Sequence, residues 1–97
     1  MTALRDWLDA RRPAVPDGLK EWLAVEGEIP VAVAGLADLG IAALDRAEVA
    51  RQLDRHAAFQ LLAADALLTY ACEAAVDEPE VASGLHLILD RCAAAWQ

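Results

Sequence analysis

Three polar residues recur every four positions along an otherwise apolar stretch of the chain: Asp65, Thr69 and Glu73. A step of four residues is close to one helical turn, so the three side chains share one face of a helix. They could hold a cation or transfer a proton, with His86 from the next helix completing the site. We favour the alternative that they form a solvent-facing edge, because every helix of a soluble protein needs one. Burial distinguishes the two interpretations, since buried carboxylates need a metal, a shared proton or a cation.

Residues suited to metal binding or covalent catalysis form no recognisable pattern. His56 and His86 are the only histidines, and neither belongs to a His-x3-His arrangement such as zinc sites use. No hydroxyl or thiol nucleophile has a base at a fixed spacing. We therefore expect no metal and no cofactor, and the sequence leans away from an enzyme.

Residues 62–73 carry a resemblance to one enzyme family. The stretch reads LAADALLT and continues through Ala71 to Glu73. It resembles a helix of the polyprenyl diphosphate synthases, which often reads Leu-x-Gly-Asp-Ala-Leu-Leu before Ala-aromatic-Glu. The resemblance implies an all-α prenyl-transferring enzyme that holds diphosphate through magnesium on two Asp-Asp-x-x-Asp clusters. This chain has no adjacent aspartates and has Ala64 in place of the glycine, so we transfer no activity and no site residue from the family.

The pattern Leu-x-x-Trp-Leu occurs twice, at residues 4–8 and 19–23. Each copy predicts an amphipathic helical turn that packs on a common core. Tryptophan is enriched at binding hot spots and is also good core material, so the sequence leaves open whether the indoles are buried. The candidate interaction surface combines two of them with a charged stretch: Trp7, Trp22, Arg51, Arg55 and His56.

Composition and length determine the expected architecture. The chain has 97 residues, 58% of them hydrophobic, and much of that share is alanine, the best helix former. Residues that favour strands are sparse. We expect one all-α domain over residues 1–97, a compact bundle of four to five helices around a central apolar helix.

The central helix is expected at about residues 46–76. Asp45 followed by Glu48 resembles a capping box that starts it, directly after a helix over residues 30–44. A helix of that length would be about 47 Å long, whereas a chain of this size forms a globule roughly 32 Å across. It therefore either breaks near residues 51–56 or overhangs and packs against another subunit.

The last helix is expected from Pro79 onward. Its apolar residues recur at steps of four and three, and that face is predicted to pack onto the central helix through Val81, Leu85, Ile88, Cys92 and Trp96.

Charge limits the classes of partner. The formal net charge is −8, and residues 61–97 contain Arg91 as their only cation. Such a surface repels phosphate backbones and anionic lipid, so we expect neither nucleic acid nor membrane as partner. The N-terminus does not resemble a signal peptide, which predicts a cytoplasmic protein.

The sequence alone supports three functional hypotheses. The leading one is a small non-enzymatic helical module that binds a protein partner or itself. The alternative is a small enzyme or a ligand- or cation-binding domain that uses the polar edge with His86. The third is an acidic decoy that occupies a basic partner.

Overall fold

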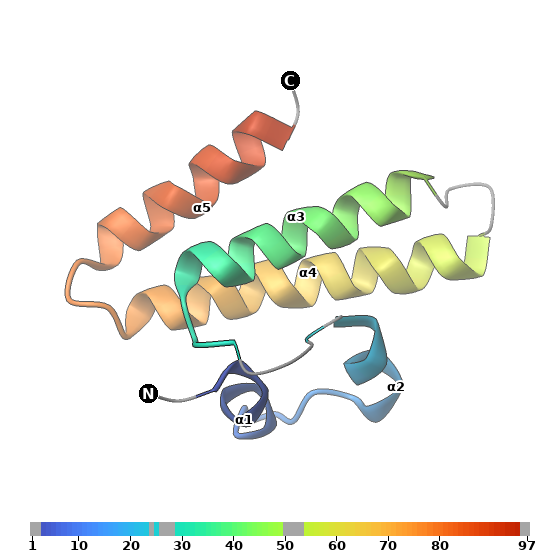
Figure 1. The fold of residues 1–97 in the computed structure, drawn as a ribbon, viewed down its shortest axis with the longest axis horizontal. Helices are drawn as coiled ribbons and strands as arrows, with labels where there is room; N and C mark the ends of the chain where they lie inside the picture. Colours follow the sequence, from blue (N-terminus) through green and yellow to red (C-terminus); the bar gives the residue numbers. More distant parts are fainter. Residues whose placement is uncertain (1–2, 24, 26–28, 50–53, 96–97) are drawn as a thin grey trace.

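The computed structural model describes residues 3–23, 25, 29–49 and 54–95, and every regular element in these ranges is a helix. Two long antiparallel helices, α3 and α4, lie side by side in the middle of the molecule (Figure 1). The fifth helix covers one side of this pair, and the short N-terminal helices lie on the other. The predicted all-α bundle is thereby confirmed. In chain order the elements are α1 (Leu4–Asp9), α2 (Asp17–Lys20), the 3-10 helix η1 (Glu21–Leu23), α3 (Val33–Val49), α4 (Asp54–Val76) and α5 (Val81–Ala95).

The described part of residues 3–30, here called the N-terminal layer, packs beneath α3 and α4. Its two ends meet where Ala3 pairs with Pro30 in an isolated β-bridge. Cations complete the end of α1, since Arg11 Nε donates to the Trp7 carbonyl at 3.2 Å and Arg12 Nη1 to that of Asp9 at 3.2 Å. The Trp7 carbonyl also accepts from the Ala10 amide at 3.3 Å, so the arginines add to the backbone bonds at this helix end.

The core between α3 and α4 is built largely from alanine, which lets the two helices approach closely. Leu36 and Leu67 are fully buried there. A Cβ added at Gly40 of α3 would lie 2.8 Å from Leu68 Cγ of α4, so a larger residue here would force the Leu68 side chain to move. Closer to the end of α3, Arg46 Nε donates to Gln60 Oε1 of α4 at 3.0 Å.

The boundary expected between the two central helices is wrong. Asp45 and Glu48 do not start a helix, because both lie inside α3, which ends at Val49. The apolar face of α3 continues past residue 44, with Ala47 buried, and this packing outweighs the local capping signal. A single helix over 46–76 is therefore excluded, and the alternative of a break is confirmed by the start of α4 at Asp54. Residues 50–53, where part of the break was expected, lie outside the described residues.

Helix α5 packs on α3 and α4 through part of the expected face. Ile88 is buried and Cys92 is half-buried against the core, as predicted. Val81 and Leu85 are instead 37% and 39% exposed, and Trp96 lies outside the described residues. The reason is Gly84, where an added Cβ would lie 2.9 Å from Ala75 Cβ of α4. This close approach turns Gly84 inward and moves the stripe of Val81 and Leu85 to the flank.

By length and composition alone, the segment Arg55–Val76 is apolar enough to cross a membrane, with a mean hydropathy of 1.3. Core helices of soluble proteins pass the same criterion. In this structure α4 packs along its length against α3.

Candidate interaction surface

The polar residues that the spacing placed on one helix face lie on α4 and are all exposed. Asp65, Thr69 and Glu73 point to solvent, and His86 is exposed on α5. Among the described residues, no three histidine, cysteine or acidic side chains are placed to hold a metal ion.

These polar residues share their side of α4 with large aliphatic side chains. At 3.6 residues per turn, the exposed positions from Leu61 round to Glu73 occupy only about 120° of the helix circumference. Leu61 is 52% exposed, Leu62 54% and Val76 65%. Cys72, a free cysteine, is exposed on the same side. The polar edge is thus one component of a mixed apolar and acidic surface.

Helix α5 adds a second aliphatic stripe. Val81, Leu85 and Leu89 follow one another at steps of four, and Leu89 is 63% exposed. Leu87 lies on the opposite flank of α5, where it lines a hollow with Val33 at the start of α3. The stripe of Leu85 therefore faces away from α3.

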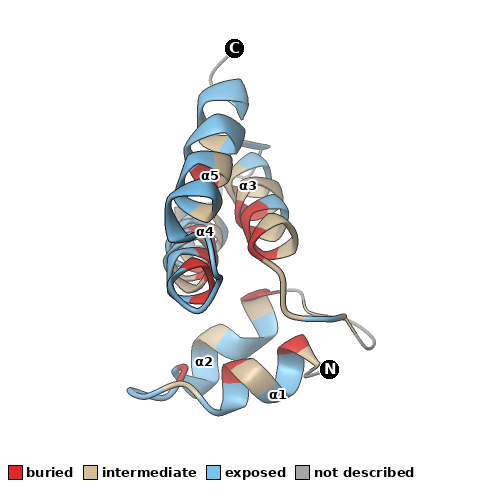
Figure 2. Ribbon diagram, turned by 90° about the vertical axis from the view of Figure 1, so that its left-hand side faces the viewer, coloured by how far each residue is buried: buried red, intermediate tan, exposed pale blue. Residues whose placement is uncertain are grey.

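The two stripes lie on the same side of the molecule. Viewed along the bundle, α4 and α5 lie one above the other with α3 beside them, and the side away from α3 is coloured as exposed (Figure 2). No other described helix covers it. We call this surface the outer face and define it by its members: Leu61, Leu62, Asp65, Thr69, Cys72, Glu73, Val76, Val81, Leu85 and Leu89.

The outer face has an acidic electrostatic environment. Asp65 and Glu73 lie within it, and acidic residues crowd the turn between α4 and α5. Arg91, the only cation of α5, is turned toward α3, where its Nε lies 3.1 Å from Asp38 Oδ1. This exposed pair adds little stability, roughly 0–1 kcal/mol, but it points the cation away from the outer face.

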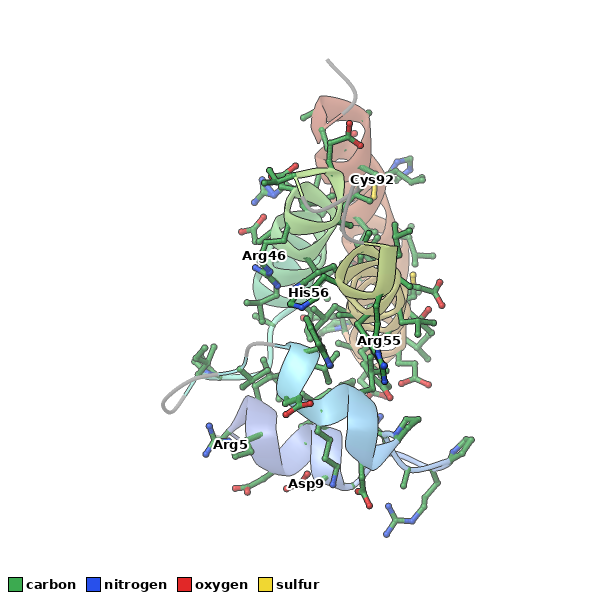
Figure 3. The ribbon with its side chains drawn as sticks, turned by 90° about the vertical axis from the view of Figure 1, so that its right-hand side faces the viewer. Arg5, Asp9, Arg46, Arg55, His56 and Cys92 are labelled. Carbon is green, nitrogen blue, oxygen red and sulfur yellow. The ribbon has the colours of Figure 1, made fainter. Side chains whose placement is uncertain are left out.

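The other sequence candidates lie where α4 meets the N-terminal layer, along the edge of the outer face. Trp22 is half-buried and stacks on Phe59, with ring centroids 5.1 Å apart and planes at 6°. His56 meets Trp22 edge-on at 5.6 Å, and the Arg55 guanidinium lies 5.9 Å from the Phe59 ring. Figure 3 shows Arg55 and His56 at the start of α4, above this layer. Arg51 lies outside the described residues.

Trp7 makes a separate contact with α4. Its ring meets that of Tyr70 edge-on at 6.1 Å, and the Arg11 guanidinium lies 3.8 Å from the Trp7 centroid. Burial, aided by the negative charge of Glu73, raises the pKa of Tyr70, while Arg11 opposes the shift. Trp7 and Trp22 thus join the N-terminal layer to α4, and their role in binding a partner stays a prediction.

The N-terminal layer contains one further concave feature, a cavity of about 310 Å³. Leu8, Val15 and Leu23 form its apolar floor. Asp9 and Lys20 lie at its rim, where Lys20 Nζ is 3.7 Å from Asp9 Oδ1. The rim charges pair with each other, and both side chains are about half exposed.

Sequence reasoning identified the polar edge and missed the aliphatic side chains around it. The available signal was the run from Leu85 to Leu89, in which Leu85, Leu87, Ile88 and Leu89 are all apolar. A helix that packs through one stripe cannot bury four apolar residues out of five, so part of this run had to be exposed.

Comparisons of the chain with protein-family models, with curated proteins and with solved structures found no match.

Proposed function

We propose that this protein is a small non-enzymatic helical module that binds another protein through the outer face of α4 and α5. The observation that carries the proposal is the exposure of Leu62, Leu85 and Leu89, at 54%, 39% and 63%, on two helices packed together. Single exposed leucines are ordinary, whereas several exposed aliphatic side chains gathered on one face are typical of interaction sites.

The balance of apolar and polar groups on the outer face supports the same proposal. Protein interfaces combine apolar anchors with polar groups that fix orientation. Leu85 and Leu89 of α5 supply anchors, while Asp65, Thr69 and Glu73 of the neighbouring α4 supply hydrogen-bond acceptors. Because both helices are held by the core, this surface is formed before a partner arrives, which lowers the entropic cost of binding.

Affinity capture from the cells that make the protein tests the proposal. The double variant Leu85→Gln/Leu89→Gln removes aliphatic area while keeping two good helix formers. The matched control is Val49→Gln, since Val49 is 87% exposed at the end of α3, away from the outer face. We expect one identified protein to be captured by the wild type and the control and lost with the double variant. A capture pattern that is the same for all three proteins contradicts the proposal.

A further inference from the structure

The partner of the outer face can be specified by its chemistry. We infer that the outer face binds an amphipathic helix whose apolar side is flanked by lysine or arginine residues spaced two turns apart. The inference rests on the proposed function and names the partner class for the same surface.

The apolar part of the face has the form of a helix-binding surface. Leu62 and Val76 are exposed on one side of α4, and Val81, Leu85 and Leu89 on α5, so each helix contributes a row of aliphatic side chains to the outer face. A third helix laid along both rows would cover them with the i, i+3, i+4 and i+7 side chains of its own apolar side.

Charge determines what flanks that apolar side. Asp65 and Glu73 are eight residues apart on one face of α4, which places them about 12 Å apart along the helix axis. Cations at positions i and i+7 of a partner helix are separated by about 10.5 Å and would match this spacing. The acidic turn at Asp77 extends the negative field beyond Glu73. Opposite charges placed in this way steer encounter and fix the register of a docked helix.

A second copy of this chain fits the same charges poorly. Arg55 is the only cation on the exposed side of α4. Consider two copies related by a twofold axis, with their α4 helices antiparallel and Arg55 of each copy against Glu73 of the other. The twofold axis then passes close to residue 64, midway between these two residues. That register places the two Asp65 carboxylates beside each other at the symmetry axis. Like charges at the middle of an interface oppose association, so self-association is disfavoured through this face.

Anionic lipid is disfavoured on the same grounds. Amphipathic surfaces that bind such membranes carry lysine and arginine beside their apolar residues. Here the neighbours of the leucines are Asp65 and Glu73.

Fluorescence anisotropy with designed peptides tests the inference. The probe is a labelled helical peptide of about five turns, with leucine along one side and lysine at i and i+7 on its flank. Two companion peptides replace lysine with glutamate, or keep the composition and scramble the helical period. We expect micromolar binding of the amphipathic lysine peptide alone, weakening as salt rises because exposed charges are screened.

Variants assign the binding to the face. Leu85→Gln/Leu89→Gln should weaken binding of the lysine peptide by about tenfold or more. Asp65→Asn/Glu73→Gln should weaken it about three- to tenfold and reduce the salt dependence. Val49→Gln and Asp45→Asn, both exposed on α3, are the matched controls and should bind as the wild type does. Circular dichroism establishes that each variant is folded.

The possible failures are distinguishable. Equal binding of the glutamate peptide, or binding that survives the Leu85→Gln/Leu89→Gln change, overturns the inference of a basic amphipathic partner. A dimer in sedimentation that the leucine variant dissociates also overturns it, but leaves the outer face as a protein-binding surface. Binding to vesicles of anionic phospholipid without binding to any peptide, or capture from cells that is insensitive to Leu85 and Leu89, overturns the proposed function as well.

Discussion

The indole of Trp22 lies stacked on the ring of Phe59, 5.1 Å away and within 6° of parallel. A second aromatic contact joins Trp7 to Tyr70, with the two rings edge-on and their centroids 6.1 Å apart. Phe59 and Tyr70 are the only phenylalanine and the only tyrosine of the chain. They are eleven residues apart, so they lie on nearly the same side of α4 about 16 Å from each other. The repeated Leu-x-x-Trp-Leu pattern therefore corresponds to a repeated aromatic contact between the N-terminal layer and α4.

A double-mutant cycle on Trp22→Leu and Phe59→Leu measures the stacked contact. Each single change should lower the free energy of unfolding, and the coupling between them should be about 0.5–1.5 kcal/mol because the stacking is lost with either ring. Urea unfolding supplies the four values. The control cycle pairs Phe59→Leu with Trp7→Leu, whose rings belong to different contacts, and it should be additive. Equal coupling in the two cycles would show that the stacking has no specific contribution.

Two glycines of α3 should respond to alanine in opposite directions. An alanine at Gly40 would bring its Cβ to 2.8 Å from Leu68 Cγ, so we expect a loss of about 1–3 kcal/mol in the free energy of unfolding. At Gly35, apart from the adjacent backbone of α3 itself, nothing lies within 4 Å of the corresponding position. There Gly35→Ala should stabilise the protein by about 0.5–1 kcal/mol, because alanine restricts the unfolded chain and favours the helix. Thermal or urea unfolding of the two variants checks both signs, and a stabilising Gly40→Ala would contradict the close helix contact.

The single tyrosine permits a direct test of its environment by titration of tyrosinate absorbance. Burial raises the pKa of Tyr70 above 10.0, Glu73 adds to the shift and Arg11 reduces it. Glu73→Gln should therefore lower the titration midpoint, and Arg11→Gln should raise it. The control is Asp65→Asn, which also neutralises a carboxylate of α4 but lies two turns from Glu73. It should leave the midpoint nearly unchanged. A wild-type midpoint at or below 10.0 would contradict the burial of the ring.

The same shift predicts how stability changes in alkali. Well below pH 10.0 the phenol is neutral in both the folded and the unfolded chain, so its contribution to stability is constant. As the pH rises above this value, the unfolded chain ionises first and the free energy of unfolding falls until the folded pKa is passed. Tyr70→Phe should remove this part of the alkaline loss. Urea unfolding of the wild type and the variant across that range measures it, and identical pH profiles would contradict the expectation.

Helix type and approximate position followed from the sequence, because alanine content and apolar periodicity act locally. The two short helices with the Leu-x-x-Trp-Leu pattern are an example, with Leu4, Leu8 and Leu23 buried as the pattern indicates. The end of α3 did not follow, since Asp45 and Glu48 form a good capping pattern in isolation. Burial of Ala47 depends on tertiary contacts that a local pattern does not contain.

The rotation of α5 could not be predicted from the sequence either. The stripe of Val81, Leu85 and Ile88 has regular apolar spacing, but Gly84 allows a closer approach to α4 than a leucine does. Contact with Ala75 therefore selects the inward face, and Val81 and Leu85 become part of the outer face. The aliphatic half of the candidate site is the result of this rotation, which explains why only its polar half was identified from the sequence.

Neutralising the polar edge tests whether those carboxylates do more than face solvent. Asp65 and Glu73 are exposed, and neither makes an ion pair among the described residues. Asp65→Asn and Glu73→Gln should therefore change the free energy of unfolding by less than about 0.5 kcal/mol each. A ligand that binds only the folded state raises the melting temperature. Two carboxylates about 12 Å apart do not chelate one ion, so added Mg²⁺ or Ca²⁺ should leave the melting temperature of the wild type unchanged. A melting shift with either cation that both variants abolish would instead establish a cation site at Asp65 and Glu73, and would shift the assignment from a protein-binding surface toward a ligand-binding one.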